Sequence, residues 1–420
     1  MNPAFAYRSG QLHAESVPLT ALAERFGTPC YVYSRIALES RYGAFVSALA
    51  PRRARVCYAV KANGNLGVLG VLAACGAGFD IVSGGELERV LAAGGDPAGV
   101  VFSGVCKLDA EIRLALSHDI ACFNVESAAE LLRLSALATE ARREARIAIR
   151  VNPDVAAGGH RHISTGRREH KFGVALAEAA ELVSRSQTLP GLKFEGVACH
   201  IGSQMLSLEP LADALEQLAD FVRELQATGL RLKHVDAGGG LGIDHAGRRA
   251  PTAAEYAEVV LGALGELGLE IFVEPGRAIA GPAGILLTRV VDMKQGHGRR
   301  FALVDAAMND LIRPALYDAW HDLLPIQQGG EPGPERVDVV GPVCETGDFL
   351  ARDRRIAIAA GDLLAISDAG AYGFAMSSNY NSRPRAAEIM VAGTQARLVR
   401  RRESTAELWR GECLFEDACP

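Results

Sequence analysis

The chain has 420 residues, of which 49% are hydrophobic and 22% charged, and its formal net charge is −6. This composition is typical of a globular protein, and the length predicts two domains because single cores rarely exceed ~250–300 residues. Without a basic excess there is no reason to expect nucleic-acid binding, and no apolar run is long enough to predict a membrane span. The N-terminal residues carry no charged-then-apolar leader, so we expect a cytoplasmic protein.

The first long region, residues 36–283, alternates short apolar runs with longer amphipathic segments. Helical crossovers connect parallel strands, so this alternation predicts a parallel sheet. About eight repeats predict closure into a (β/α)8 barrel, and an open doubly wound sheet is the alternative. The predicted strands are 56–60, 79–82, 100–102, 121–124, 147–151, 194–199, 233–236 and 271–273, and the clearest helices are 85–93, 126–142, 176–185, 208–226 and 253–267.

The alternation of strands and helices ends after about residue 284, where strand-like runs follow one another with few long helices between them. This pattern predicts a mostly β second domain. The strand-like run 30–33 precedes the barrel, so we assign it to the same β domain, which then comprises residues 1–35 and 284–420. The strands predicted in its C-terminal part are 286–294, 301–305, 336–340, 363–367 and 388–391.

Lys61 is expected at the end of the first barrel strand, within Tyr-Ala-Val-Lys-Ala-Asn. Lysine is rarely buried without a partner. Such a position suits an amine that reacts with a carbonyl, as in a Schiff base with pyridoxal phosphate. The alternative is a lysine whose stem lies along the strand end while its ammonium group reaches water.

Other polar or glycine-rich features fall near the ends of later barrel strands. Asp80 lies in the second strand, His200 ends the sixth, glycines 238–242 follow the seventh, and Glu274 follows the eighth. The carboxyl ends of barrel strands meet at one mouth, where active sites lie. A single histidine at a strand end is more often structural, but the convergence of several such residues favours a site. The glycines suit a phosphate, because their backbone N–H groups can approach an anion closely.

The β domain contributes further candidate site residues. Cys344 lies beside Glu345 in a loop rich in turn-forming residues, and no Cys-x-x-Cys pair occurs in the chain, so we expect no metal site. Arg313 and Tyr317 offer a charge and a hydroxyl suited to a ligand carboxylate, and Tyr372 stands among small residues. Each of these residues could instead belong to the surface or the core.

Taken together, the motifs resemble those of diaminopimelate decarboxylases, which are fold type III (alanine-racemase-like) pyridoxal-phosphate enzymes. Thr346 stands where serine is common in that family. The motifs that carry the resemblance are YAVKAN at 58–63, FDIVSGGEL at 79–87, NPDV at 152–155, ISTG at 163–166, KFG at 171–173, HIGSQ at 200–204, GGGLG at 238–242, EPGR at 274–277, MNDLIRPALY at 308–317, GPVCETGDFLA at 341–351, AYGF at 371–374 and NYNSRPRAAEIMV at 379–391.

The resemblance implies a pyridoxal-phosphate-binding barrel plus a β domain, in a homodimer with shared active sites. It implies that Lys61 forms the Schiff base, that His200 stacks on the cofactor, and that Cys344 donates a proton from the partner subunit. The implied cofactor-binding residues are Lys61, Asp80, His200, Ser203, Gly239, Gly240, Glu274, Gly276, Arg277 and Tyr372. The implied substrate-binding residues are Arg277, Arg313, Tyr317, Glu345 and Tyr372.

The implied reaction is decarboxylation of meso-2,6-diaminopimelate to L-lysine and CO2, the last step of lysine biosynthesis. A decarboxylase of another basic amino acid, such as ornithine, lysine or carboxynorspermidine, is one alternative, although it would have less use for Arg313. A related racemase and a non-catalytic pyridoxal-phosphate carrier are the others. The loop with Cys344 argues against both of them.

Overall fold

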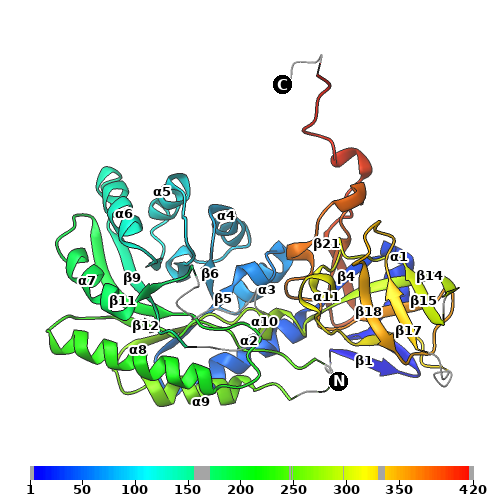
Figure 1. The fold of residues 1–420 in the computed structure, drawn as a ribbon, viewed down its shortest axis with the longest axis horizontal. Helices are drawn as coiled ribbons and strands as arrows, with labels where there is room; N and C mark the ends of the chain where they lie inside the picture. Colours follow the sequence, from blue (N-terminus) through cyan, green and yellow to red (C-terminus); the bar gives the residue numbers. More distant parts are fainter. Residues whose placement is uncertain are drawn as a thin grey trace. The chain divides into compact units, whose positions relative to one another are not determined.

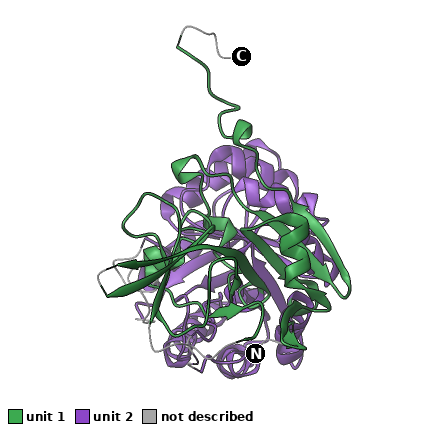
Figure 2. Ribbon diagram, turned by 90° about the vertical axis from the view of Figure 1, so that its right-hand side faces the viewer, with its two compact units in different colours: residues 1–37, 280–420 green, residues 38–279 purple. Residues whose placement is uncertain are grey.

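The computed structural model describes residues 4–155, 171–245, 247, 249–296, 298–329 and 336–415. The motif at 163–166 lies outside these residues. The chain separates into two compact units, one of residues 38–279 and the other of residues 1–37 with 280–420 (Figure 2). Within the described residues, no helix has both the length and the apolar character needed to cross a membrane.

The unit of residues 38–279 contains a closed ring of parallel strands, which confirms the predicted barrel (Figure 1). The ring closes because β13 pairs with β5 and β8 pairs with β9. A short strand, β10 (Val174–Ala175), adds to the edge of β9. In the described residues the ring consists of β5 (Ala54–Ala59), β6 (Gly78–Ile81), β7 (Val100–Phe102), β8 (Cys122–Val125), β9 (Ala145–Asn152), β11 (Leu192–Cys199), β12 (His234–Asp236) and β13 (Glu270–Val273).

Helices lie outside the ring of strands (Figure 1). Several of them begin where the sequence offers a side-chain oxygen to cap the first turn. Ser83 and Ser127 accept hydrogen bonds from the N–H groups of Glu86 and Glu130, and Thr252 forms a capping box with Glu255. The helices are α2 (Arg35–Leu49), α3 (Leu66–Ala74), α4 (Gly84–Ala92), α5 (Asp109–Ser117), α6 (Ala128–Glu140), α7 (Leu176–Ser186), α8 (Glu209–Ala227), α9 (Ala253–Leu264) and the short α10 (Arg277–Ala280).

Small and apolar side chains fill the inside of the ring. A buried cluster there contains Cys57, Cys122, Ala148, Ala198 and Phe272, which come from strands all around the barrel. Such filling makes the barrel a packed core rather than a pore, so ligands are restricted to its mouth.

The other unit is mostly β, as predicted. Its larger sheet has the order β18-β17-β15-β14-β4-β20-β21, and β19 joins β14 to β16. The predicted run 30–33 forms β4, which pairs with β14 and β20 and so belongs to this sheet. The strands are β4 (Cys30–Ser34), β14 (Gly284–Gly296), β15 (Arg299–Val304), β16 (Leu323–Pro325), β17 (Val337–Val340), β18 (Phe349–Arg354), β19 (Leu363–Ile366), β20 (Ala387–Ala392) and β21 (Gln395–Arg400), while β1 (Phe5–Arg8), β2 (Gln11–Ala14) and β3 (Val17–Pro18) form a separate antiparallel sheet, and the helices are α1 (Leu19–Phe26) and α11 (Arg313–Tyr317).

Candidate active site

Lys61 lies just beyond the first barrel strand. Strand β5 ends at Ala59, and Lys61 falls in the 3₁₀ turn Val60–Ala62, so it does not end the strand itself as predicted. Its Nζ lies 2.5 Å from Oδ2 of Asp80, a fully buried residue of β6, while 32% of the Lys61 side chain is exposed. The turn therefore places the amine at the mouth of the barrel with a carboxylate beneath it.

The pKa of Asp80 is raised by burial and by the negative charge of Glu274, while the ammonium group of Lys61 lowers it. Oδ1 of Asp80 is buried and has no hydrogen-bond partner among the described residues. Burying a polar atom without a hydrogen bond costs free energy unless a further group, such as a ligand, supplies the hydrogen bond.

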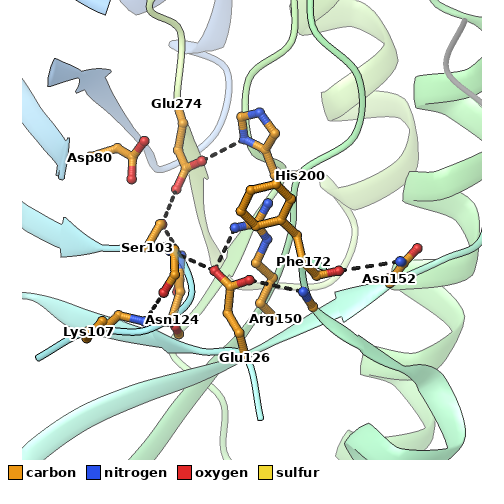
Figure 3. Close-up of polar contacts among 12 residues, drawn as sticks. Asp80, Ser103, Lys107, Asn124, Glu126, Arg150, Asn152, Phe172, His200 and Glu274 are labelled. Carbon is orange, nitrogen blue, oxygen red and sulfur yellow. Dashed lines mark hydrogen bonds and ion pairs between the residues drawn. The ribbon is translucent and has the colours of Figure 1, made fainter. Parts of the chain in front are cut away.

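His200 and Glu274 meet at the ends of β11 and β13. Nδ1 of His200 lies 2.9 Å from Oε2 of Glu274, and the hydroxyl of Ser103 donates a hydrogen bond of 3.2 Å to Oε1 (Figure 3). Burial by itself would raise the pKa of Glu274, but the hydrogen bond and charge of His200 and the charges of Lys61 and Arg150 lower it to about 2. Glu274 is therefore held as an ionised carboxylate. Nδ1 of His200 faces both this carboxylate and the N–H of Gly239, 3.3 Å away.

The glycine-rich loop after β12 packs directly on the end of β13. Gly238 and Gly240 have φ of 69° and 87°, a left-handed conformation that glycine adopts without strain. The carbonyl oxygen of Gly238 accepts hydrogen bonds from the N–H of Glu274 and the hydroxyl of Tyr256, at 2.7 and 2.9 Å. A Cβ added to Gly239 would lie 2.2 Å from the carbonyl oxygen of Glu274. The loop thus lies against the backbone of Glu274, with no room for a side chain at Gly239.

The remaining predicted residues of the barrel unit lie near the same strand ends. Nη2 of Arg277 donates a hydrogen bond of 3.0 Å to the hydroxyl of Ser203. A Cβ on Gly276 would lie 3.0 Å from the Cβ atoms of Ala59, which precedes the turn that holds Lys61, and of Ala62, which ends that turn. The structure therefore brings the strand-end residues of this unit together.

Four of the predicted residues of the β unit form two groups. Arg313 opens α11, where it is buried, and Tyr317 ends the same helix. In an exposed loop, the N–H of Cys344 donates to Oδ1 of Asn381 at 2.7 Å, and Glu345 accepts a hydrogen bond of 3.3 Å from the hydroxyl of Tyr380.

Tyr372 has a φ of 54°. A bulky side chain rarely takes this left-handed conformation, which persists only where the surrounding structure requires it.

A polar network that the sequence motifs do not predict lies beneath Glu274 (Figure 3). Asn124 donates a hydrogen bond of 3.0 Å to the Ser103 hydroxyl, so the single hydroxyl hydrogen of Ser103 is directed to Glu274. Glu126 accepts hydrogen bonds from Nη1 of Arg150 and the N–H of Gly104, both at 2.7 Å. Ser103 and Glu126 directly follow β7 and β8. Polar residues at the carboxyl ends of barrel strands are expected at the mouth, and this expectation, which identified His200, could also have identified them.

Comparison with known proteins gives consistent results for the whole chain. A family model described as "Pyridoxal-dependent decarboxylase, pyridoxal binding domain" matches residues 35–281. The diaminopimelate decarboxylase of Pseudomonas aeruginosa is 55% identical over 411 residues, which cover 98% of this chain and 99% of that protein. The chain belongs to the diaminopimelate decarboxylase family.

Solved structures agree with this membership. The diaminopimelate decarboxylase of M. jannaschi is 33% identical with a TM-score of 0.94, and the match covers 99% of both chains. The diaminopimelate decarboxylase of Helicobacter pylori, solved in complex with L-lysine, is 40% identical with a TM-score of 0.90, covering 93% of this chain and 98% of that one.

The residues at the barrel mouth fit the family's cofactor, pyridoxal phosphate. Lys61 provides an amine, Glu274 provides an ionised carboxylate, and Oδ1 of Asp80 has no hydrogen-bond partner among the described residues. The glycines of the loop at Gly239 leave its backbone uncovered by side chains, as close approach of a phosphate group requires.

Proposed function

We propose that this chain decarboxylates meso-diaminopimelate at its D centre and releases L-lysine and CO2. The observation that carries the proposal is the identity of 55% with a diaminopimelate decarboxylase along nearly the full length of both chains. The family members solved with L-lysine hold the compound that this reaction would produce. The arrangement of Lys61, Asp80, His200 and Glu274 supports the same chemistry.

The barrel residues would hold and tune the cofactor. When bound, pyridoxal phosphate supplies an electron-withdrawing ring that stabilises the carbanion left by loss of CO2. Nζ of Lys61 would hold it as a Schiff base, and His200 would lie against its ring. Glu274, ionised at neutral pH, would keep a proton on the ring nitrogen, because an anion at that position favours the protonated form. The phosphate would be held by Ser203, Gly239, Gly240, Gly276, Arg277 and Tyr372.

The residues of the β unit would select the substrate and finish the reaction. Arg313, with Arg277, Tyr317 and Tyr372, would bind the distal carboxylate, and Glu345 would bind the distal ammonium group. The Cys344 thiol would donate a proton to the α-carbon, a step for which an ordered acid within reach is required. We place Cys344 and Glu345 in the partner subunit's site, within a homodimer.

We also propose the domain division predicted from the sequence, with a barrel of residues 36–283 and a β domain formed by the rest. The two compact units, which divide the chain after residues 37 and 279, support it. The cytoplasmic location stays a prediction.

The experiment is to incubate the purified protein and pyridoxal phosphate with meso-diaminopimelate, ornithine, lysine or carboxynorspermidine, and to measure CO2 and the amine product. We expect CO2 and L-lysine from diaminopimelate alone. Faster release from another amino acid would reassign the substrate, and no release from any of them would favour a carrier. Lys61→Ala should remove the visible absorbance of the bound cofactor and nearly all turnover. Lys294→Ala, at an exposed position of β14, is the matched control and should leave both unchanged.

A further inference from the structure

Arg313 has a histidine partner that the proposed mechanism does not use. Nη1 of Arg313 lies 3.2 Å from Nε2 of His321, four residues beyond the end of α11. Only 3% of Arg313 is exposed, and His321 is fully buried. On its other side, Nδ1 of His321 lies 2.8 Å from the carbonyl oxygen of Ser367, which follows β19. The imidazole therefore connects the arginine to the backbone of the sheet.

The chemistry of the two partners fixes the protonation state of His321. A carbonyl oxygen can only accept, so Nδ1 must carry a hydrogen. A guanidinium group can only donate, so Nε2 must offer its lone pair to Arg313. An imidazole with one donor and one acceptor nitrogen is neutral. A protonated His321 would instead direct an N–H and a positive charge at the guanidinium group of Arg313.

His321 is also held by contacts that do not involve Arg313. Nη2 of Arg354, at the end of β18, donates a hydrogen bond of 2.9 Å to the carbonyl oxygen of His321. The guanidinium group of Arg354 lies over the ring of Trp320, the preceding residue. Residues near the ends of two strands thus fix the histidine, while α11, with its five residues, is too short to be rigid by itself.

We propose that His321 is a positioning residue for substrate recognition. As a neutral acceptor it binds one of the five N–H donors of Arg313 and so sets the direction in which the guanidinium group meets the distal carboxylate of the substrate. This inference rests on the proposed role of Arg313. The specificity of the site then depends on Arg313, on His321 and on the carbonyl oxygen of Ser367, which selects the tautomer of His321.

The test compares His321→Leu, His321→Asn and His321→Gln in the holoenzyme. Leucine removes the acceptor, and asparagine is too short to reach both partners, whereas glutamine can accept from Arg313 and donate toward Ser367. We expect the Leu and Asn variants to raise KM for meso-diaminopimelate about 10- to 100-fold with kcat nearly unchanged, and the Gln variant to recover most of the loss. Binding of L-lysine, which keeps the same carboxylate, should weaken in parallel in calorimetry. His118→Leu, at an exposed position after α5, is the control and should change neither quantity.

Arg313→Lys separates failure of this inference from failure of the proposed function. If Arg313→Lys leaves KM unchanged, the proposed role of Arg313 is wrong. If it raises KM but the His321 variants do not, or if the two effects simply add in the double variant, His321 does not act through Arg313. A fall in kcat and cofactor occupancy together with the rise in KM would assign His321 a purely structural role. Should His321→Leu fail to fold, the contrast between the Asn and Gln variants decides.

Discussion

Gly239→Ala is the substitution that most directly tests the close contact between the glycine-rich loop and Glu274. The new Cβ would lie 2.2 Å from the carbonyl oxygen of Glu274, 2.9 Å from its carbonyl carbon and 3.5 Å from Cε1 of His200. Favourable contacts of carbon atoms are at ~3.5–4.0 Å, so the first of these distances is short by more than ~1 Å. Because the atoms involved belong to the backbone, rotation of a side chain cannot relieve the clash.

The loss of stability in Gly239→Ala depends on the contacts that resist displacement of the loop. The loop is held by the hydrogen bonds between Gly238 and the N–H of Glu274, at 2.7 Å, and between the N–H of Gly238 and Asp236, at 2.8 Å. Overpacking costs about 1–3 kcal/mol, and each weakened hydrogen bond about 1 kcal/mol more. Replacing glycine with alanine also stabilises the folded protein by about 0.4–1 kcal/mol, because it lowers the conformational entropy of the unfolded chain. If both hydrogen bonds weaken, we expect a net loss of about 2–5 kcal/mol in stability.

The assay has two parts, thermal unfolding of the cofactor-free protein and titration with pyridoxal phosphate followed by absorbance. If the loop binds the phosphate, its displacement should weaken cofactor binding about 10- to 100-fold. Gly262→Ala is the matched control, because Gly262 is exposed in α9 with nothing within 4 Å of an added Cβ, and there alanine should stabilise by about 1 kcal/mol. A Gly239→Ala protein that unfolds and binds cofactor like the wild type would refute the reasoning.

Three further predictions concern the pH dependence of stability, a buried ion pair and the dimer. Burial lowers the pKa of His234 to about 4 from 6.5, so the unfolded chain binds a proton that the folded chain does not between these values. Stability is therefore lost as pH falls through that window, by about 2 kcal/mol from pH 7 to 4.5, and urea unfolding of His234→Gln should show correspondingly less loss. Lys107→Met removes the buried partner of Glu130, 2.6 Å away, and should cost about 3–5 kcal/mol in the same assay, with Lys107→Met/Glu130→Gln costing less. Exchange of subunits between inactive Lys61→Ala and Cys344→Ala proteins should restore roughly one quarter of wild-type activity, and no recovery after proven exchange would place both residues in one subunit's site.

The barrel was predictable because its strands are buried on both faces and read as short apolar runs. The run 100–102 matches β7 to the residue, whereas the predicted 56–60 extends one residue beyond β5 into the turn that holds Lys61. Helix α3 was not predictable from periodicity, because Leu66–Ala74 is apolar on nearly every side and lacks the 3.6-residue period that marks a surface helix.

The expectation that polar residues at the carboxyl ends of barrel strands form the site identified His200 and Glu274, but not the polar network beneath Glu274. Glu126 and Ser127 follow β8, and Ser127 is the N-cap of α6, so polar residues there already have a local explanation. That Glu126 also contacts Arg150 and Gly104 depends on strand neighbours that only the closed sheet defines. The same applies to His321, whose tautomer depends on a carbonyl group 46 residues later in the chain.

The carboxyl groups at the barrel mouth show why the contacts of each residue matter more than its type. Asp236 and Glu274 are both buried, yet the pKa of Asp236 is raised well above its usual range by burial and by the charge of Glu274, while the pKa of Glu274 is lowered. Glu274 has donors in His200 and Ser103, whereas Asp236 accepts from the N–H of Gly238. Ionising two neighbouring carboxyl groups costs additional free energy because their charges repel. The charge is therefore favoured on the group with more hydrogen-bond donors. The two opposite shifts in pKa therefore favour the negative charge on Glu274, the carboxylate proposed to face the ring nitrogen, over a charge on Asp236.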